Sequence, residues 1–203
     1  MERVWFITGA SRGFGRAFTE EAVKRGDKVI ATVRHVPHDD IFKHPSVLTV
    51  VMDVTKTDEV EKAIKDGMNR FGRIDVLINN AGFGFSGAFE ETTDEDLRNL
   101  FETDYFGVVN VTRRVIPLMR KAGKGVILNV SSQGGLMGFS GSSAYCAAKF
   151  AVVGLSDMVE KGNLPPRILI GAACCRAMKA RYEAELKDIA SYEAAASKTD
   201  FEE

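Results

Sequence analysis

Cysteine is scarce in this 203-residue chain, which contains three. Cys174 and Cys175 are adjacent and make a poor disulfide, and Cys146 has no spacing to them that suits a metal site. This usage favours a reduced, intracellular protein, which we expect to be cytoplasmic. Cys146 is interpreted as a small packing residue, because no neighbouring base marks it as a nucleophile.

Charge of one sign and long apolar runs are also absent. The chain has 27 Lys and Arg residues against 28 Asp and Glu residues, so its formal net charge is −1. This balance argues against nucleic acid as a partner, because nucleic-acid-binding proteins usually carry a strongly basic face. No apolar run approaches the roughly 18 residues of a membrane span, and the first residues lack a signal peptide's apolar stretch. Residues 1–203 are predicted to form a single soluble domain.

Short β-rich runs alternate with longer helical patterns from residue 4 to about residue 160. An apolar stripe from Val60 to Phe71 predicts one helix, and a capping box of Thr92 and Glu95 opens another that continues towards Arg120. The alternation predicts an α/β fold with a doubly wound parallel sheet in three αβα layers. Because they are apolar on both faces, five runs are predicted as its strands, namely 4–8, 28–33, 47–53, 74–79 and 125–131.

Thr8–Gly15 is a glycine-rich turn between a predicted strand and a predicted helix. Glycine lets the backbone approach a pyrophosphate, whose charge is stabilised at the helix N-terminus. The alternative is that these glycines serve only the steric needs of the turn. Polar residues at later strand ends favour the phosphate site, because open α/β folds bind ligands at that edge of the sheet. They are Asp53, Asn79-Asn80-Ala81-Gly82 and Ser131-Ser132.

Ser132, Tyr145 and Lys149 form a candidate catalytic group. Tyr145 and Lys149 are four residues apart on a predicted helix, which places them on one face. A free tyrosine has a pKa of about 10, and a nearby ammonium group favours the phenolate that a general base requires. Ser132 is placed to hydrogen-bond a substrate oxygen that gains or loses charge. For the Tyr-x-x-x-Lys pair alone, an ordinary amphipathic helix face is the better interpretation.

Taken together, these clusters resemble the short-chain dehydrogenase/reductase family. Thr8–Gly15 matches its Thr-Gly-x-x-x-Gly-x-Gly signature, and residues 79–82 match its Asn-Asn-Ala-Gly. Ser132, Tyr145 and Lys149 match its Ser and Tyr-x-x-x-Lys, with the family's spacing between serine and tyrosine. The resemblance covers residues 4 to about 157 and implies a Rossmann-type fold, with residues 1–157 as the family core.

The resemblance implies roles for single residues. Tyr145 would be the general acid or base, Lys149 would hold the nicotinamide ribose, and Ser132 would position the substrate oxygen. Hydride would pass directly to or from the nicotinamide, without a metal, and Asp53-Val54 would contact the adenine ring. The implied cofactor-binding residues are Thr8, Gly9, Ser11, Arg12, Gly13, Phe14, Gly15, Arg34, Asp53, Val54, Asn80, Ala81, Gly82, Tyr145 and Lys149.

Charge near the expected cofactor favours NADP over NAD. Family members that use NAD usually carry an acid at the end of the second strand, to hold the ribose hydroxyls. Here that position is Val33, and Arg34 follows it. Arg34 and Arg12 are placed to face a 2′-phosphate, although both also suit ordinary surface arginines. Histidines and aspartates between His35 and His44 make a metal site conceivable, but a solvated polar loop is the better interpretation and no metal is predicted.

The sequence departs from the family pattern in two places. Asp104 stands where the family normally has asparagine, on an apolar seam, so a buried carboxylate that needs a partner or a proton is expected. The helix with Tyr145 and Lys149, predicted over 143 to about 160, runs almost at once into a segment that resembles the family's last strand. The usual sixth strand with its Pro-Gly turn and the substrate lid are therefore expected to be missing. Residues 158–203 would hold a strand at 167–170 and a helix at 172–196.

The leading hypothesis is an NADP-dependent alcohol dehydrogenase or carbonyl reductase acting on a small-molecule secondary alcohol or ketone. The alternative is a catalytically weak NADP(H)-binding sensor or interaction module, favoured by Asp104 and the missing segment. By resemblance, a homodimer or homotetramer is expected, formed through the helices containing residues 97–120 and 145–160. The segments around Ser132 and Tyr145 are most similar to branches that handle hydroxysteroids, retinoids and related alcohols.

Overall fold

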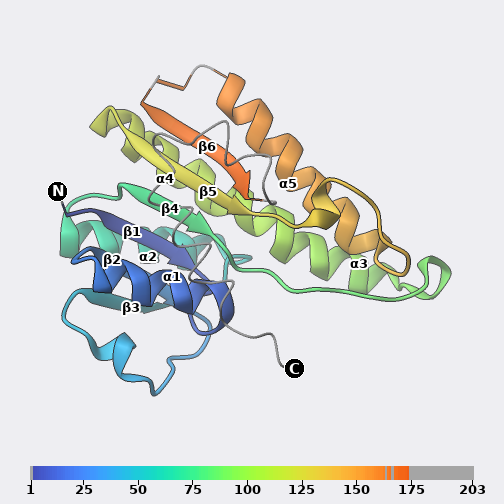
Figure 1. Cartoon of the computed structure of the whole chain (residues 1–203), viewed down its shortest axis with the longest axis horizontal. Coiled ribbons are helices and arrows are strands. Elements are labelled where there is room, and N and C mark those ends of the chain that lie inside the picture. Colours follow the sequence, from blue (N-terminus) through green and yellow to red (C-terminus); the bar gives the residue numbers. More distant parts are fainter. Residues whose placement is uncertain (1, 163, 166, 174–203) are drawn as a thin grey trace.

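The computed structural model describes residues 2–162, 164–165 and 167–173 and contains one six-stranded sheet (Figure 1). Every strand pairing is parallel, and the order across the sheet is β3-β2-β1-β4-β5-β6. This order confirms the predicted doubly wound parallel sheet. The strands are β1 (Val4–Thr8), β2 (Lys28–Val33), β3 (Val47–Val51), β4 (Val76–Asn79), β5 (Gly125–Val130) and β6 (Ile168–Ala173).

Helices connect these strands and cover both faces of the sheet, as the three-layer prediction requires. The longer helices are α1 (Gly13–Lys24), α2 (Thr57–Phe71), α3 (Asp94–Phe101), α4 (Gly107–Ala122) and α5 (Ser143–Lys161). Short 3₁₀ turns are η1 (Asp40–Lys43), η2 (Phe89–Glu91) and η4 (Gln133–Gly135), and η3 (Glu102–Phe106) is a π-helical segment. In the part of the chain that is described, no helix is long and apolar enough to cross a membrane.

Two apolar cores hold the layers together. On one face, Phe18 and Ala22 of α1 and Phe42 of η1 pack against the sheet. On the other, α2 and α4 contribute the second core, with α2 presenting the predicted stripe that includes Val60 and Ile64. β1 and β4 are buried along their whole length, which explains why these runs are apolar on both faces.

Some predicted boundaries are wrong by one or two residues. β3 ends at Val51 rather than residue 53, since the Asp53 N–H turns to donate to Glu59 Oε2 at 2.7 Å. β4 begins at Val76 rather than residue 74, and β5 ends one residue before Ser131. In each case the discrepancy places a polar residue just outside the sheet.

The predicted capping box of Thr92 and Glu95 is wrong. Thr93 is the N-cap of α3, and its hydroxyl oxygen accepts a hydrogen bond from the Asp96 N–H at 3.1 Å. The Thr92 hydroxyl instead donates to Ala88 O at 2.9 Å. The N-cap is therefore shifted by one residue, because Thr92 bonds within the preceding η2 turn.

The strand predicted at 167–170 is confirmed as β6 and takes the sixth place in the sheet, so the expectation that the sixth strand is missing is wrong. Ile168–Ala173 pairs in parallel with β5, directly after the short connection from α5. Ala172 and Ala173 belong to this strand and not to the helix predicted over 172–196, whose remaining residues lie outside the described part of the chain. In the sequence Cys174 follows this strand, so the family's Pro-Gly pair does not occur there.

Candidate active site

The glycine turn lies at the carboxyl end of β1, where three glycines have different tasks. Gly9 and Gly13 have φ angles of +66° and +54°, a region that other residues rarely adopt. Gly15 has no such angle, but a Cβ there would collide with Gly9 O. Gly15 therefore allows α1 to pack directly against the turn, so that its first amide groups face the end of the sheet.

Thr8 and Asn80 tie the ends of β1 and β4 together. The Thr8 hydroxyl oxygen accepts hydrogen bonds from the N–H groups of Asn80 and Ala81, both at 2.9 Å. The Asn80 side chain donates from Nδ2 to Thr8 O and to Gly9 O, each at 3.0 Å. These bonds fix the backbone of the turn from the neighbouring strand. Thr8 thus contributes to the site by holding the backbone of the turn in position.

Asn79 and Asn80 point to different places, although the sequence treats them as one motif. Asn79 is buried, and its Nδ2 donates to Thr112 Oγ1 at 2.8 Å and to Asn129 Oδ1 at 2.7 Å. Asn129 in turn donates to Ser156 Oγ at 2.9 Å. This buried network joins β4 and β5 to α4 and α5, whereas Asn80 faces the ligand edge of the sheet.

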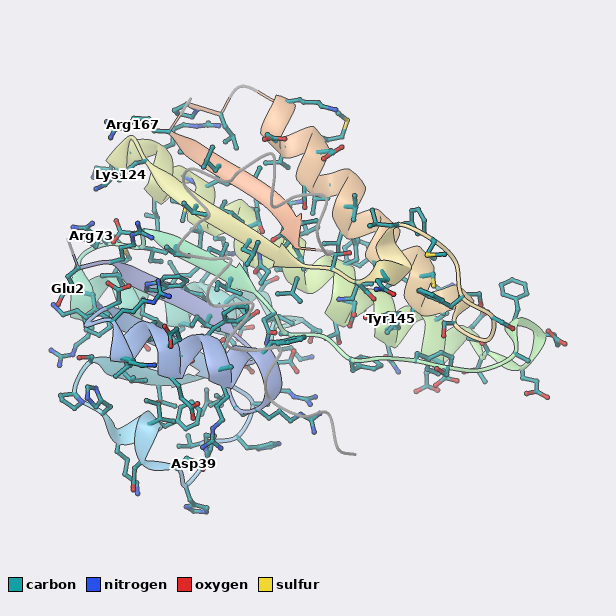
Figure 2. All side chains as sticks on the ribbon, viewed as in Figure 1. Glu2, Asp39, Arg73, Lys124, Tyr145 and Arg167 are labelled. Carbon is teal, nitrogen blue, oxygen red and sulfur yellow. The ribbon has the colours of Figure 1, made fainter. Side chains whose placement is uncertain are left out.

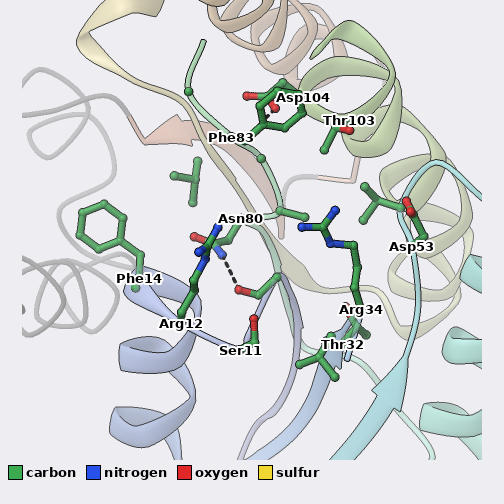
Figure 3. Close-up of a pocket in the computed structure, with 18 of the residues that line it drawn as sticks. Ser11, Arg12, Phe14, Thr32, Arg34, Asp53, Asn80, Phe83, Thr103 and Asp104 are labelled. Atoms are coloured by element: carbon green, nitrogen blue, oxygen red, sulfur yellow. Dashed lines mark hydrogen bonds between the residues drawn. The ribbon is translucent and has the colours of Figure 1, made fainter. Parts of the chain in front are cut away.

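A cleft of about 630 Å³ lies over these strand ends (Figure 3). It sits where the strand order reverses between β1 and β4, the usual ligand position in doubly wound sheets. Three predicted site residues, Thr8, Gly15 and Ser132, do not line it. The predicted residues that do are Gly9, Ser11, Arg12, Gly13, Phe14, Arg34, Asp53, Val54, Asn80, Ala81, Gly82, Asp104, Tyr145 and Lys149.

Tyr145 and Lys149 line the cleft from the first turns of α5. Figure 2 labels Tyr145 on this helix. The Lys149 ammonium lies 5.6 Å from the centroid of the Tyr145 ring, which confirms the shared helix face. Lys149 is only 5% exposed and donates from Nζ to Val130 O at 3.2 Å. The structure therefore holds a buried cation beside a half-buried phenol.

Asp104 is fully buried at the same end of the cleft, next to Phe83 (Figure 3). Its Oδ2 lies 3.1 Å from Lys149 Nζ, and its Oδ1 accepts a hydrogen bond from the Phe83 N–H at 3.0 Å. In this ion pair the Lys149 ammonium is the group that faces Oδ2. Burial raises the pKa of the Asp104 carboxyl, and the opposing attraction of Lys149 is smaller. The expected partner is thus present.

Ser132 does not line the cleft, and its link to Tyr145 runs through Gly134. It is the N-cap of η4, and its hydroxyl oxygen accepts a hydrogen bond from the Gly134 N–H at 3.1 Å. Gly134 packs against Tyr145, since a Cβ on it would lie 3.4 Å from Tyr145 Cε1 and 3.2 Å from Cys146 Sγ. The buried Cys146 is therefore in a packing position.

Arg12 and Arg34 provide positive charge at the opposite end of the cleft (Figure 3). Both are exposed, and no carboxylate of the described residues pairs with either. β2 ends at Val33, which is buried. This is the position at which an acid was sought in the sequence and not found. Asp53 is engaged locally, because its Oδ1 accepts hydrogen bonds from both the N–H and the hydroxyl of Thr55 at 2.9 Å.

The cleft also contains residues that sequence reasoning did not select as site residues. Ser131 was named in a strand-end cluster but given no role, and several others directly neighbour predicted residues at strand ends, so extending each cluster by one residue would have found them. Thr103 carries no such signal, because only the π-helical turn brings it to the cleft. The unselected lining residues are Thr32, Val33, Met52, Phe83, Gly84, Thr103, Val130 and Ser131. Within the described residues, no three His, Cys, Asp or Glu side chains are grouped to hold a metal.

Comparison with known proteins decides the family, because the model of the short chain dehydrogenase family matches residues 3–190. The chain belongs to this family. An oxidoreductase of Botryotinia fuckeliana, BOA17, is 43% identical over 166 residues, which are 79% of this chain and 60% of that protein. A 3-ketodihydrosphingosine reductase of Bacteroides thetaiotaomicron is 43% identical over 155 residues, or 76% of this chain and 56% of that protein. The short-chain dehydrogenase described here thus matches less than two thirds of either relative.

Solved structures of the family have the same fold. A short-chain dehydrogenase from Streptomyces avermitilis superposes with a TM-score of 0.82 at 36% identity, covering 97% of this chain and 82% of the other. ElxO with NADP bound gives 0.79 at 31% identity, with 85% and 72% covered. A family member from Burkholderia phymatum in complex with NAD gives 0.76 at 27% identity, with 85% and 64% covered.

Proposed function

We propose that the chain is an NADP-dependent oxidoreductase that transfers hydride between the nicotinamide and a secondary alcohol or ketone. The observation that carries this proposal is one cleft lined both by the glycine turn and by Tyr145 and Lys149. A turn for phosphate and a phenol beside a cation are the two halves of such a site. Family membership and the oxidoreductase relatives support it.

The residues of the cleft fit a dinucleotide. Gly9 and Gly13 bend the backbone without a side chain in the way, and the start of α1 offers N–H groups to a pyrophosphate. Asp53 and Val54 line the part of the cleft assigned to the adenine ring. When bound, NADP(H) supplies the hydride or accepts it. The chain needs to supply binding, orientation and one proton.

Tyr145 is assigned the proton transfer, because its hydroxyl is the group in the cleft that can both give and take a proton near the substrate oxygen. Lys149 stabilises negative charge on that hydroxyl through its buried ammonium, which Val130 O and Asp104 hold in place. Lys149 is also assigned to the nicotinamide ribose. Ser132, held next to Tyr145 through Gly134, is assigned to orient the substrate oxygen.

NADP is preferred over NAD in this proposal because of the charges around Arg34. Arg12 and Arg34 are cations without a carboxylate partner among the described residues, so both are available to a 2′-phosphate. Val33 places no acid at the end of β2 that would repel it. ElxO, which has this fold, binds NADP, while the protein from Burkholderia phymatum binds NAD.

The substrate proposed is a small-molecule ketone or the corresponding alcohol, in keeping with the relative named as a 3-ketodihydrosphingosine reductase. A cytoplasmic homodimer or homotetramer is proposed for the assembly. Phe106 at the end of η3 and Phe150 on α5 are exposed apolar residues within the segments expected to associate.

The test is NADPH oxidation, followed by absorbance, over a panel of ketones at saturating NADPH. Oxidation that requires both the ketone and the protein supports the proposal. The alternative, a catalytically weak NADP(H)-binding sensor, is favoured by the Asp104–Lys149 ion pair, which occupies the cation that catalysis would use. NADPH binding without oxidation of NADPH by any ketone would establish that alternative.

A further inference from the structure

Asp104 and Lys149 are opposite charges buried at one end of the cleft. Both line it, and they come from η3 and α5, which pack against each other. Their side chains are 0% and 7% exposed, and Oδ2 of the aspartate lies 3.1 Å from Nζ of the lysine. Water screens charges at this depth only weakly. Among the described residues, the other charged side chains that line the cleft follow β1, β2 and β3, across the point where the strand order reverses (Figure 3), and are Arg12, Arg34 and Asp53.

The carboxylate of Asp104 is held against the backbone that lines the cleft. Its Oδ1 accepts a hydrogen bond from the Phe83 N–H at 3.0 Å. A Cβ added at Gly82 would lie 3.1 Å from Oδ2, so the carboxylate occupies the space that a side chain at this position would need. Gly82 and Phe83 both line the cleft. The negative charge is therefore fixed directly behind the wall of the cleft, where its field reaches a bound ligand through little water.

The pair sets the net charge at this end of the cleft. Lys149 alone would make the end positive, and an ionised Asp104 cancels that charge at a distance of 3.1 Å. An uncharged residue at position 104 would leave one net positive charge beside Tyr145. The two cases differ by a full unit of charge, although the lysine is the same in both.

We propose that Asp104 raises the affinity of the cleft for NADP⁺ relative to NADPH, so that the residue at position 104 selects the redox state of the cofactor. This inference rests on the proposed function, which delivers hydride and proton to the same carbonyl group and so brings the nicotinamide to the Tyr145 end of the cleft. The nicotinamide ring is positively charged in NADP⁺ and uncharged in NADPH, while the phosphates and the adenine are the same in both. A fixed charge near the ring therefore acts on the difference between the two forms.

The size of the effect follows from Coulomb's law. At an effective dielectric constant of about 20, opposite unit charges about 10 Å apart attract each other enough to change an affinity by on the order of tenfold. The carboxylate contributes this attraction to NADP⁺ and nothing comparable to the uncharged ring of NADPH. NADP⁺ is the form of the cofactor that alcohol oxidation consumes, so Asp104 biases the site towards that direction of the reaction.

The test measures the dissociation constants of NADP⁺ and NADPH by calorimetry, for the wild type and for Asp104→Asn. Because burial raises the pKa of the Asp104 carboxyl, the titrations are made at about pH 8.5, which favours its ionised form. The amide keeps an acceptor for the Phe83 N–H and removes the charge. The ratio of the NADP⁺ constant to the NADPH constant is expected to rise by on the order of tenfold in the variant. A ratio that is unchanged, or that falls, would overturn the inference.

Two further variants separate charge from structure. Asp104→Ser removes the charge with a different shape and is expected to raise the ratio as much, so either variant tests the inference if the other fails to fold. Asp53→Asn is the matched control, because it also removes a carboxylate that lines the cleft, but on the side assigned to the adenine ring. Its ratio is expected to stay at the wild-type value, since the adenine is the same in both forms of the cofactor. An equal rise in the control would overturn the inference, because the total charge of the cleft would then be the cause.

Turnover separates this inference from the proposed function. A ratio that shifts as expected, in a protein that converts no ketone or alcohol, supports the inference and contradicts the proposed function. Turnover with a ratio that does not depend on the charge at position 104 contradicts the inference alone. Binding of neither cofactor contradicts both.

Discussion

Asp104 gives this site a charge balance of its own. Its carboxylate is fully buried and shares Lys149 with the phenol of Tyr145. The carboxylate therefore neutralises part of the electrostatic field of the Lys149 ammonium. A protonated or amide side chain at the same position would leave that field to act on Tyr145.

Asp104→Asn is accordingly expected to raise the rate of NADPH oxidation and to move the pH–rate profile to lower pH. The amide keeps an acceptor for the Phe83 N–H but removes the negative charge beside Lys149. The measurement is kcat against pH for the wild type and the variant. An identical profile in both would show that Asp104 is electrostatically uncoupled from Tyr145.

Unfolding free energy against pH gives an independent reading of the same variant. Because burial raises the pKa of Asp104, the folded state binds the proton more tightly than the unfolded state. The wild type therefore loses stability relative to Asp104→Asn as the pH rises from about 4, the ordinary pKa of an aspartate, through the raised value. Above that window the difference is constant. Urea titrations at several pH values measure it, and a difference that grows in favour of the wild type would contradict the assignment.

Arg34→Asp is expected to weaken NADPH binding by about 1.5 to 3 kcal/mol, the worth of one charge-assisted contact. NADH, which lacks the 2′-phosphate, should be affected much less. Fluorescence titration with both cofactors measures the difference. An equal loss for both would mean that Arg34 has a structural role in the cleft.

Residues belonging to a motif could be placed from the sequence, and the others could not. Gly9, Asn80 and Lys149 occur next to strand ends or at a fixed helical spacing, so topology alone brings them to one edge. Ser132 was expected at that edge and lies just behind it. Phe83 was not selected as a site residue, because its loop has no periodicity that fixes its direction. The buried seam predicted that Asp104 needs a partner or a proton, but the identity of that partner, Lys149, depends on tertiary packing.

At the scale of elements, the packing of α1 against the glycine turn depends on the absence of a side chain at Gly15. Gly15 lies within α1, where a Cβ would meet Gly9 O, Gly9 C and Asn80 Nδ2 at less than 3 Å. Backbone atoms cannot rotate away from such a contact. The helix and the turn must therefore separate if any larger residue replaces Gly15.

Gly15→Ala is expected to destabilise the protein by about 1 to 3 kcal/mol and to weaken NADPH binding, because overpacking shifts the turn. Gly154→Ala is the matched control, since Gly154 lies within α5 and a Cβ added there would have no atom within 4 Å. It should stabilise by roughly 1 kcal/mol through helix propensity. Chemical denaturation of both variants measures this, and equal effects would contradict the packing argument.

The elements themselves were largely predictable, while their ends were not. β1 and β2 match their predicted ranges, because continuous apolar runs define them on both sides. The helix predicted from residue 92 towards Arg120 is interrupted by η3, which has no signature in the apolar spacing. That π-helical segment contains Asp104, whose contact with Lys149 is distant in sequence.

At the scale of the whole molecule, one sheet carries the strand ends at which the predicted ligand-binding residues lie. The first five strands and their parallel direction were predicted from the alternating pattern. The place of β6 beside β5 was not, because the segment before it is short in this chain. The chain also matches only 60% and 56% of the curated relatives named above. Cofactor binding therefore tests whether this length of chain completes the nucleotide site.

NADPH is expected to raise the midpoint of thermal unfolding by about 5 to 10 °C at a concentration a hundred times its dissociation constant. Ligand linkage gives about 2.7 kcal/mol at that ratio, and each kcal/mol moves the midpoint by about 2 to 4 °C for a protein of this size. NADH at the same concentration should give a smaller rise. No shift with either cofactor would show that the cleft does not bind a dinucleotide.

The most direct test of the central claim compares Tyr145→Phe with the wild type in NADPH oxidation and in NADPH affinity. The variant removes the hydroxyl that moves the proton and keeps the ring that packs against Gly134. The account predicts that turnover falls by about 10² to 10⁴ while NADPH affinity stays nearly unchanged, because cofactor binding is spread over the glycine turn and Lys149. A Phe variant with near-wild-type turnover would contradict the assignment of Tyr145 and the mechanism built on it.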